Sequence, residues 1–122
     1  MKLSAAEYEI MDCIWNRQGP VSGNDVLAAL GAQKGWKQPT VLTFLSRLVE
    51  KGMLHTEKQG KLRSYTPALT REAYKNEETK DFLGQFYGGS VQNLIACMAR
   101  GDKISPQELD ALRAWLKERE LE

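Results

Sequence analysis

Two threonines and an arginine are the residues best suited to recognise a ligand. Thr40, Thr43 and Arg47 recur at positions i, i+3 and i+7, a spacing that places them on one face of a helix. Hydroxyl and guanidinium groups can hydrogen-bond to the edges of DNA bases in the major groove and to phosphates. The same spacing also fits an ordinary amphipathic helix at a protein surface, so this stretch alone does not decide between the two.

The helix that carries these side chains is predicted over residues 39–51. Pro39 suits the first turn, where its missing N–H would have no partner, and Gly52 suits a left-handed residue just past the end. The opposite face is apolar at helical spacing and is expected to be buried; its members are Val41, Phe44, Leu45 and Leu48. The helix would thus be held against a core while its polar face points outward.

Catalytic, metal and cofactor chemistry find little support. His55 is the only histidine, and no acid, cysteine or second histidine stands at ligand spacing from it. The chain has no glycine-rich phosphate loop. Cys13 and Cys97 lie far apart without a CxxC neighbour and are expected to be free, buried thiols in a reducing compartment. We therefore predict no enzyme, no metal site and no cofactor.

Size and charge favour a small protein with a polyanionic partner. A chain of 122 residues, 42% hydrophobic and 27% charged, can form one domain, or one small domain with an appendage. It has no apolar run long enough to span a bilayer and no signal-peptide pattern at its start, so we expect a cytoplasmic protein without membrane insertion. Residues 34–63 hold seven basic and two acidic side chains. Such a segment indicates a polyanion partner or simply a solvated basic face.

Two further helices are predicted before the helix at 39–51. Ser4 and Glu7 have the spacing of a capping box that opens the first helix. Ser22 and Asp25 repeat that spacing for the second helix, which we expect to end at Gly31.

A loop and a hairpin flank the third helix. Residues 32–38 are predicted to form the loop, with Trp36 either plugging the core beneath it or lying beside a phosphate. Residues 54–59 and 62–67 read as two strands joined by a turn at 60–61. Four side chains of this hairpin are expected to point inward: Leu54, Thr56, Leu62 and Tyr65.

The predicted fold is mainly α. Three helices followed by a two-stranded basic hairpin make a winged helix-turn-helix over residues 1–69, in which the third helix enters the major groove and the hairpin follows the DNA backbone or the minor groove. Residues 70–122 are predicted to form three helices that are too thin for a core of their own, and we interpret them as a dimerisation module rather than a segment folded back on the first domain. The side chains expected at the dimer interface are Phe82, Phe86, Leu94, Ile95, Met98, Leu109, Leu112, Trp115 and Leu116.

Motifs along nearly the whole chain resemble the penicillinase-repressor (BlaI/MecI/CopY) family. In the first part of the chain they are Leu3-Ser-x-x-Glu7-x-x-Ile10-Met11-x-x-Ile14-Trp15, Trp36-x-x-x-Thr40-Val41-x-Thr43-x-Leu45-x-Arg47-Leu48-x-x-Lys51-Gly52 and Gly60-x-x-x-x-Tyr65-x-Pro67. In the C-terminal part they are Phe86-Tyr-Gly-Gly-Ser90-Val-x-x-Leu94 and Ile104-Ser-x-x-Glu108-Leu-x-x-Leu112. The resemblance implies a homodimeric repressor on a palindromic operator of the TACA/TGTA kind, with intertwined C-terminal helices. It also implies control of β-lactam-response or other stress genes. The alternative is a winged-helix protein–protein interaction module without specific DNA binding.

The resemblance also implies roles for residues. Thr40 and Thr43 match threonines of the recognition helix that contact bases, and Arg47 matches an arginine that contacts phosphate or braces the fold. Many relatives carry a basic residue where Pro39 stands, so the bases read here can differ, and Leu42 could touch a thymine methyl. The residues expected along the DNA backbone are Ser22, Lys37, Ser46, Arg47, Lys61 and Arg63.

Release of the repressor is implied only in outline. Relatives induced by β-lactams, through a membrane-bound sensor and protease pathway, are cleaved at an Asn-Phe bond in the helix after the Gly-Ser pair. The corresponding pair here is Cys97-Met98, which marks the position of a possible inactivating cleavage. Because the Asn-Phe sequence is absent, the resemblance does not imply the same cleavage. The copper-responsive branch ends in a Cys-x-Cys cluster, whereas this chain ends Lys-Glu-Arg-Glu-Leu-Glu, which excludes a copper-sensing tail.

Overall fold

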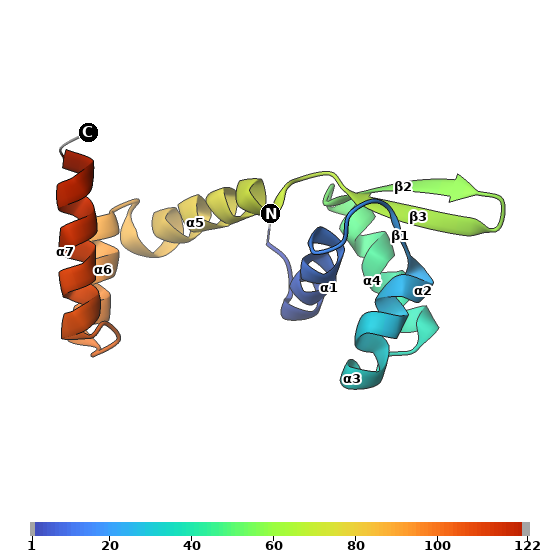
Figure 1. The fold of residues 1–122 in the computed structure, drawn as a ribbon, viewed down its shortest axis with the longest axis horizontal. Coiled ribbons are helices and arrows are strands. Elements are labelled where there is room, and N and C mark those ends of the chain that lie inside the picture. Colours follow the sequence, from blue (N-terminus) through green and yellow to red (C-terminus); the bar gives the residue numbers. More distant parts are fainter. Residues whose placement is uncertain (1, 121–122) are drawn as a thin grey trace. The chain divides into compact units, whose positions relative to one another are not determined.

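The computed structural model describes residues 2–120 and divides the chain into two compact units, 1–78 and 79–122 (Figure 1). The first unit holds the helices α1 (Ala5–Trp15), α2 (Gly23–Val26), η1 (Leu27–Gly31), α3 (Ala32–Lys34) and α4 (Gln38–Glu50), and the strands β1 (Val21–Ser22), β2 (Leu54–Gln59) and β3 (Leu62–Pro67). Helix α5 (Arg71–Tyr87) begins in the first unit and ends in the second, which also holds α6 (Val91–Arg100) and α7 (Pro106–Glu120). In the described residues no helix combines the length and apolarity needed to cross a membrane.

Both predicted capping boxes are confirmed. Ser4 Oγ accepts a hydrogen bond from the Glu7 amide at 3.2 Å, and the Glu7 carboxylate accepts one from the Ser4 amide at 2.8 Å. Ser22 and Asp25 make the same two bonds at 3.1 and 2.9 Å. These bonds satisfy amides that the first turn of a helix leaves without partners, so they fix where α1 and α2 begin.

The sequence predicted that the second helix ends at Gly31, and this prediction was wrong. The helical path runs on through η1 and α3 to Lys34, and Gly35, with φ +71°, is the left-handed residue that ends it. Gly31 is instead needed for close packing, because a Cβ there would lie 2.7 Å from Leu27 Cδ1 and 3.2 Å from the Trp36 carbonyl oxygen. The loop between the second and third helices is therefore shorter than the predicted loop over residues 32–38.

The sheet contains one strand more than the predicted hairpin. β2 and β3 pair antiparallel across the Gly60 turn as expected, and the short β1 pairs with the other edge of β3. The placement of Leu62 was wrong: it is 66% exposed, whereas Tyr65 is 4% exposed. Three positions separate them, so on a strand with period two they face opposite sides.

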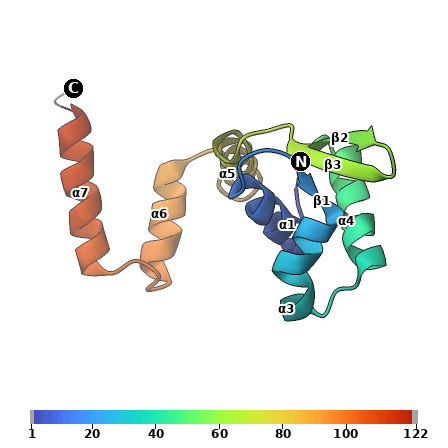
Figure 2. The same cartoon turned by 45° about the vertical axis from the view of Figure 1, so that its right-hand side comes forward.

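The core of the first unit lies between the helices and the sheet. Figures 1 and 2 show α1, α2 and α4 gathered on one side of the three strands, with the hairpin reaching past α4. The fully buried side chains come from all of these elements and are Ile10, Met11, Ile14, Val21, Val26, Val41, Leu45, Leu48 and Met53. Burial of Val41, Leu45 and Leu48 confirms most of the apolar face predicted for the third helix, and Phe44 is half-buried against the same core.

The first turns of α5 pack against α1. Arg71 Nη2 donates to Asp12 Oδ1 at 2.7 Å and its guanidinium lies over the Trp15 ring, whose Nε1 donates to the Leu69 carbonyl at 3.0 Å. Tyr74 is buried and stacks near Tyr8. Residues up to 78 thus join the first compact unit, while the predicted division at 69/70 into two functional domains stays a prediction.

The second unit has helices but no interior. None of the residues 79–120 is buried, and α6 and α7 make few contacts with each other or with the end of α5. Ser90 caps α6 and Ser105 caps α7, because their hydroxyls accept hydrogen bonds from the Asn93 and Glu108 amides at 3.1 Å each. The expectation of two buried thiols was wrong, because Cys97 is exposed and Cys13 only half-buried.

Candidate nucleic-acid interface

Helix α4 presents its polar residues to solvent. Thr40, Thr43 and Arg47 are exposed, as are Leu42 and Ser46 on the side of the helix nearer the hairpin. The Thr43 hydroxyl donates to the Pro39 carbonyl at 2.9 Å, so it presents its oxygen lone pairs as acceptors. The helix therefore offers acceptor, apolar and cationic groups side by side.

Aromatic packing supports the first half of α4 on the side that faces the core. The Trp36 and Phe44 ring centroids lie 5.2 Å apart, and both rings are half-buried against the core. The Arg47 guanidinium lies 6.0 Å from the centre of the Phe44 ring. This packing supports the interpretation of Trp36 as a core plug and leaves the charge of Arg47 at the surface.

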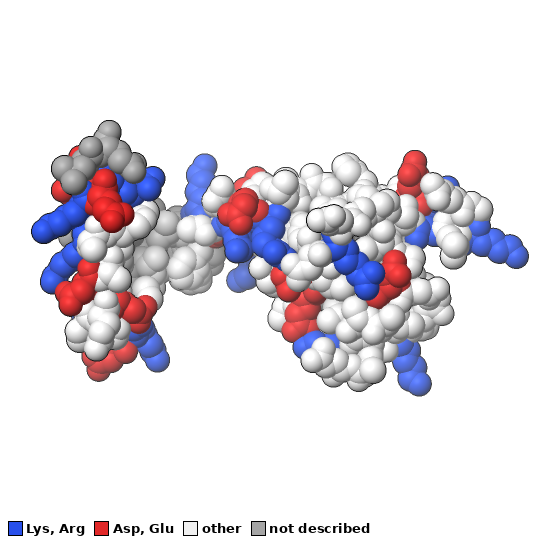
Figure 3. Space-filling model, in the orientation of Figure 1, with Lys and Arg blue, Asp and Glu red and all other residues white. Residues whose placement is uncertain are grey.

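Two of the seven basic residues between 34 and 63 are used inside the fold. Lys34 Nζ pairs with Glu9 Oε1 at 2.7 Å, and Lys51 Nζ pairs with the buried Glu7 carboxylate at 2.6 Å. The remaining five are exposed and carry no ion pair among residues 2–120; they are Lys37, Arg47, Lys58, Lys61 and Arg63. The basic side chains of the hairpin project from its free end, as the space-filling view shows (Figure 3).

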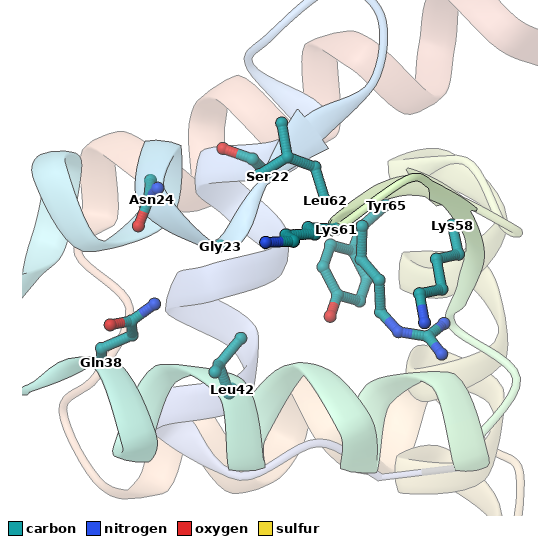
Figure 4. Close-up of a pocket in the computed structure, with 10 residues that line it drawn as sticks. Ser22, Gly23, Asn24, Gln38, Leu42, Lys58, Lys61, Leu62 and Tyr65 are labelled. Carbon is teal, nitrogen blue, oxygen red and sulfur yellow. The ribbon is translucent and has the colours of Figure 1, made fainter.

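A cavity of about 320 Å³ lies between the hairpin, the start of α2 and helix α4. In Figure 4, Gln38 and Leu42 come from α4, Ser22 and Asn24 from β1 and α2, and Lys61 from the hairpin. The full lining is Ser22, Gly23, Asn24, Gln38, Leu42, Lys58, Lys61, Leu62, Arg63 and Tyr65. Four residues predicted to touch DNA border this cavity: Ser22, Leu42, Lys61 and Arg63.

Sequence reasoning missed two polar residues of this surface, Asn24 and Gln38, and it counted Lys58 among the basic residues of segment 34–63 without assigning it a DNA contact. Gln38 is the first residue of α4 and Asn24 the second of α2, positions where an exposed amide faces whatever approaches the helix start. Lys58 could have been assigned to this surface from the register, because it stands directly opposite Arg63 on the neighbouring strand.

An exposed polar helix beside a basic hairpin, on a core of three helices and a small sheet, defines a winged-helix DNA-binding protein. The profile of the penicillinase-repressor family matches residues 3–118, and the chain belongs to that family. It is accordingly a DNA-binding transcriptional repressor and not an enzyme.

Named relatives agree over most of their length. The penicillinase repressor of Bacillus licheniformis is 31% identical over 117 residues, which cover 96% of this chain and 91% of that protein. The methicillin resistance regulatory protein MecI of Staphylococcus aureus is 27% identical over 118 residues, covering 97% and 95%. A solution structure of the monomeric form of Bacillus licheniformis BlaI in complex with the blaP half-operator is similar with a TM-score of 0.52 and 34% identity, covering 61% of this chain and 89% of that one.

Proposed function

We propose that the protein acts as a homodimer that represses transcription by occupying a palindromic operator of the TACA/TGTA kind. The observation that carries this proposal is the exposed row of polar and apolar side chains on α4 beside the unpaired cations of the hairpin. In winged-helix proteins a helix of this kind enters the major groove, and two-fold symmetry of the protein is matched by symmetry of the site.

The base-reading residues of the proposal are Thr40, Leu42 and Thr43. The Thr43 hydroxyl already donates to the backbone, so its lone pairs are best suited to accept from an adenine or cytosine amino group. Leu42 is 40% exposed and offers an apolar surface for a thymine methyl. Each good contact would favour the correct base by about 1–3 kcal/mol.

The backbone-holding residues set the register of the helix in the groove. Lys37 stands just before α4, Ser46 and Arg47 lie on α4, and Lys61 and Arg63 lie at the hairpin end. Ser22 is the cap of α2 and borders the same cavity as the hairpin cations. Contacts of this type supply affinity that falls with rising salt.

The partner in the dimer is a second copy of the chain, held through residues 79–120. Phe82 and Phe86 pack together at 5.4 Å between ring centroids, yet Phe86 is 60% exposed, and Trp115 and Leu116 are about half exposed. Helices with this much uncovered apolar surface and no buried residue are stabilised when a matching set covers them. The remaining members of the interface are Leu94, Ile95, Met98, Leu109 and Leu112, all half-buried.

Loss of the dimer would end repression, because joining two half-sites raises affinity by roughly 10²–10⁴ over one half-site. The proposed setting is the cytoplasm, with β-lactam-response or other stress genes as targets and a membrane-bound sensor and protease pathway as one route of induction. Cys97 and Met98 lie inside α6, so a protease acting there must first find the helix locally unfolded.

DNA binding is tested by measuring affinity for a TACA/TGTA palindrome and for a scrambled duplex at one salt concentration. We expect tighter binding to the palindrome, and Thr43→Val should reduce that preference because the γ-methyl replaces the acceptor oxygen. Equal affinity of the unmodified protein for both duplexes would contradict the proposal.

Dimerisation is tested by sedimentation of the full chain. Phe86→Ser should shift the chain towards monomer and weaken binding to the full palindrome more than binding to a half-site. Lys117→Ser, a change at an exposed polar position on α7, is the matched control and should leave the dimer intact. A monomeric unmodified chain at micromolar concentration would refute this part of the proposal.

A further inference from the structure

The hairpin places two cations directly opposite each other. The antiparallel register pairs Lys58 on β2 with Arg63 on β3, and both side chains border the cavity between the hairpin and α4. Like charges at opposed positions of a sheet repel and destabilise it. The free protein therefore holds a local repulsion at the base of its cavity.

Lys58 and Arg63 have no ion-pair partner in the part of the chain that the structure describes. Glu57, the neighbour of Lys58, has Ser64 as its partner across the strands and so faces the other side of the sheet. Glu50 borders an adjoining cavity that Arg63 also lines, so it is a competing anion.

The cavity has the chemistry of an oxyanion site. Its ten lining residues include three cations, Lys58, Lys61 and Arg63, and no aspartate or glutamate. Asn24 on α2 and Gln38 on α4 add neutral hydrogen-bond donors opposite the hairpin, and Ser22 adds a hydroxyl from β1 beside β3 (Figure 4). Arginine and lysine together with neutral donors are the groups that bind phosphate oxygens.

We propose that this cavity seats one backbone phosphate of the bound DNA, with Lys58 and Arg63 gripping it from one side and Asn24 and Gln38 from the other. The proposal rests on the proposed function and names a site for one strand of the duplex. The strand that borders the groove entered by α4 must pass between that helix and the hairpin, and the cavity lies there. A bound phosphate places negative charge beside both cations and offsets their mutual repulsion, so DNA binding stabilises the hairpin.

This site predicts opposite effects of one substitution on stability and on binding. Lys58→Gln removes the repulsion, so at low ionic strength the melting temperature of the free protein should rise by roughly 1–5 °C. The same change removes one phosphate contact, so the steepness of log affinity against log salt should fall by about 0.9. Between 50 and 200 mM salt, the variant should therefore lose roughly threefold less affinity than the unmodified protein. Arg63→Gln added to Lys58→Gln should raise the melting temperature no further.

Lys75→Gln is the matched control, because Lys75 is exposed on α5 and lies outside the cavity. It should change neither the melting temperature nor the salt slope. Glu50→Gln tests the competing anion. It should leave the melting temperature unchanged, and it should leave DNA binding unchanged or slightly tighter. A clear drop in melting temperature on Glu50→Gln would mean that Glu50, not DNA, neutralises Arg63, and would overturn the proposal.

The DNA side is tested with a TACA/TGTA duplex in which single phosphates are replaced by neutral methylphosphonates. One position should weaken binding of the unmodified protein and have no effect on the Lys58→Gln, Arg63→Gln variant. Loss at the same positions in both proteins would overturn the phosphate seat while leaving the proposed function intact. Failure of the unmodified protein to bind the unmodified duplex would instead refute the proposed function.

A parallel titration with inorganic phosphate separates the two sources of the anion. The seat is expected to give no saturable change in the amide signals of Asn24 and Lys58 at millimolar phosphate, because a free ion lacks the positioning that the duplex provides. Saturation by free phosphate at micromolar concentration would identify an independent small-anion site and contradict the assignment to DNA.

Discussion

Replacing Glu7 by glutamine should separate the contribution of the ion pair with Lys51 from that of the capping box at the start of α1. The Glu7 side chain is 4% exposed and its Oε1 accepts from Ser4 N at 2.8 Å and from Lys51 Nζ at 2.6 Å. Lys51 caps the C-terminus of α4 while Glu7 lies in the first turn of α1, so this ion pair ties the recognition helix to the core. Glutamine keeps the size and an acceptor oxygen but removes the charge.

The expected loss follows from the two bonds. A hydrogen bond to a charged group is worth about 1.5–3 kcal/mol, against about 0.5–1.5 kcal/mol for a neutral one, so two weakened bonds amount to about 2 kcal/mol. Two effects reduce that figure: Lys51 remains 35% exposed, and glutamine avoids the cost of burying a carboxylate whose Oε2 has no partner. We therefore expect Glu7→Gln to lower the free energy of unfolding by about 1–2 kcal/mol at neutral pH.

The pH dependence of this loss has a definite sign. Burial raises the pKa of Glu7, but the hydrogen bonds from Lys51 and Ser4 outweigh it and hold the pKa below its ordinary value of 4.5. A carboxyl with a lowered folded-state pKa stabilises the protein above its unfolded-state pKa, and that contribution is lost as the pH falls through the folded-state value. The difference between the two proteins should thus be full at pH 7 and shrink below about pH 4.5.

Urea unfolding at fixed protein concentration, followed at pH 7 and again at pH 3.5, measures the loss in unfolding free energy at each pH. Glu9→Gln is the matched control, because the Glu9–Lys34 pair is as short, at 2.7 Å, but lies at the surface with both side chains more than a third exposed. It should cost less than about 0.5 kcal/mol. Equal losses for the two variants, or a Glu7→Gln loss that persists undiminished at acid pH, would refute the reasoning.

Three further changes test the packing of particular residues. Gly31→Ala should destabilise by about 1 kcal/mol, because contact of the new Cβ with Leu27 and the Trp36 carbonyl outweighs the helix propensity of alanine, whereas Gly84→Ala, with nothing within 4 Å, should stabilise by about 0.5–1 kcal/mol. Thermal unfolding compares the two, and the same sign for both would contradict this account. Leu62→Thr should change stability by less than about 0.5 kcal/mol in urea, and a larger loss would mean that Leu62 packs inward after all.

Local signals in the sequence were sufficient for most of the winged helix. The serine caps, Pro39 near the start of α4 and Gly52 with φ +79° act through neighbouring backbone atoms, so their spacing alone locates the elements. The two runs around Gly60 likewise determine the hairpin, because a two-residue turn sets the register of both strands.

Features that depend on tertiary packing could not be predicted in this way. A glycine at position 31 is typical of a helix end, but here it allows Leu27 and the Trp36 carbonyl to pack closely against the helix. Nothing in the sequence shows that close approach. The cavity beside α4 draws on residues 22–24, 38 and 58–65, which only the folded chain brings together. Pairing of Lys51 with Glu7 likewise neutralises one of the seven basic residues counted in segment 34–63.

The uneven distribution of buried side chains links stability to DNA binding in the proposed dimer. All buried apolar residues described in the structure lie before residue 79, so the first unit can stay folded at any dilution, whereas the second gains its stability only where a second copy covers it. Dilution should then loosen α6 and α7 and separate the two recognition helices in a single equilibrium. Because a single half-site binds roughly 10²–10⁴ more weakly than two joined half-sites, occupancy of the operator should fall more steeply with protein concentration than a simple one-site isotherm allows.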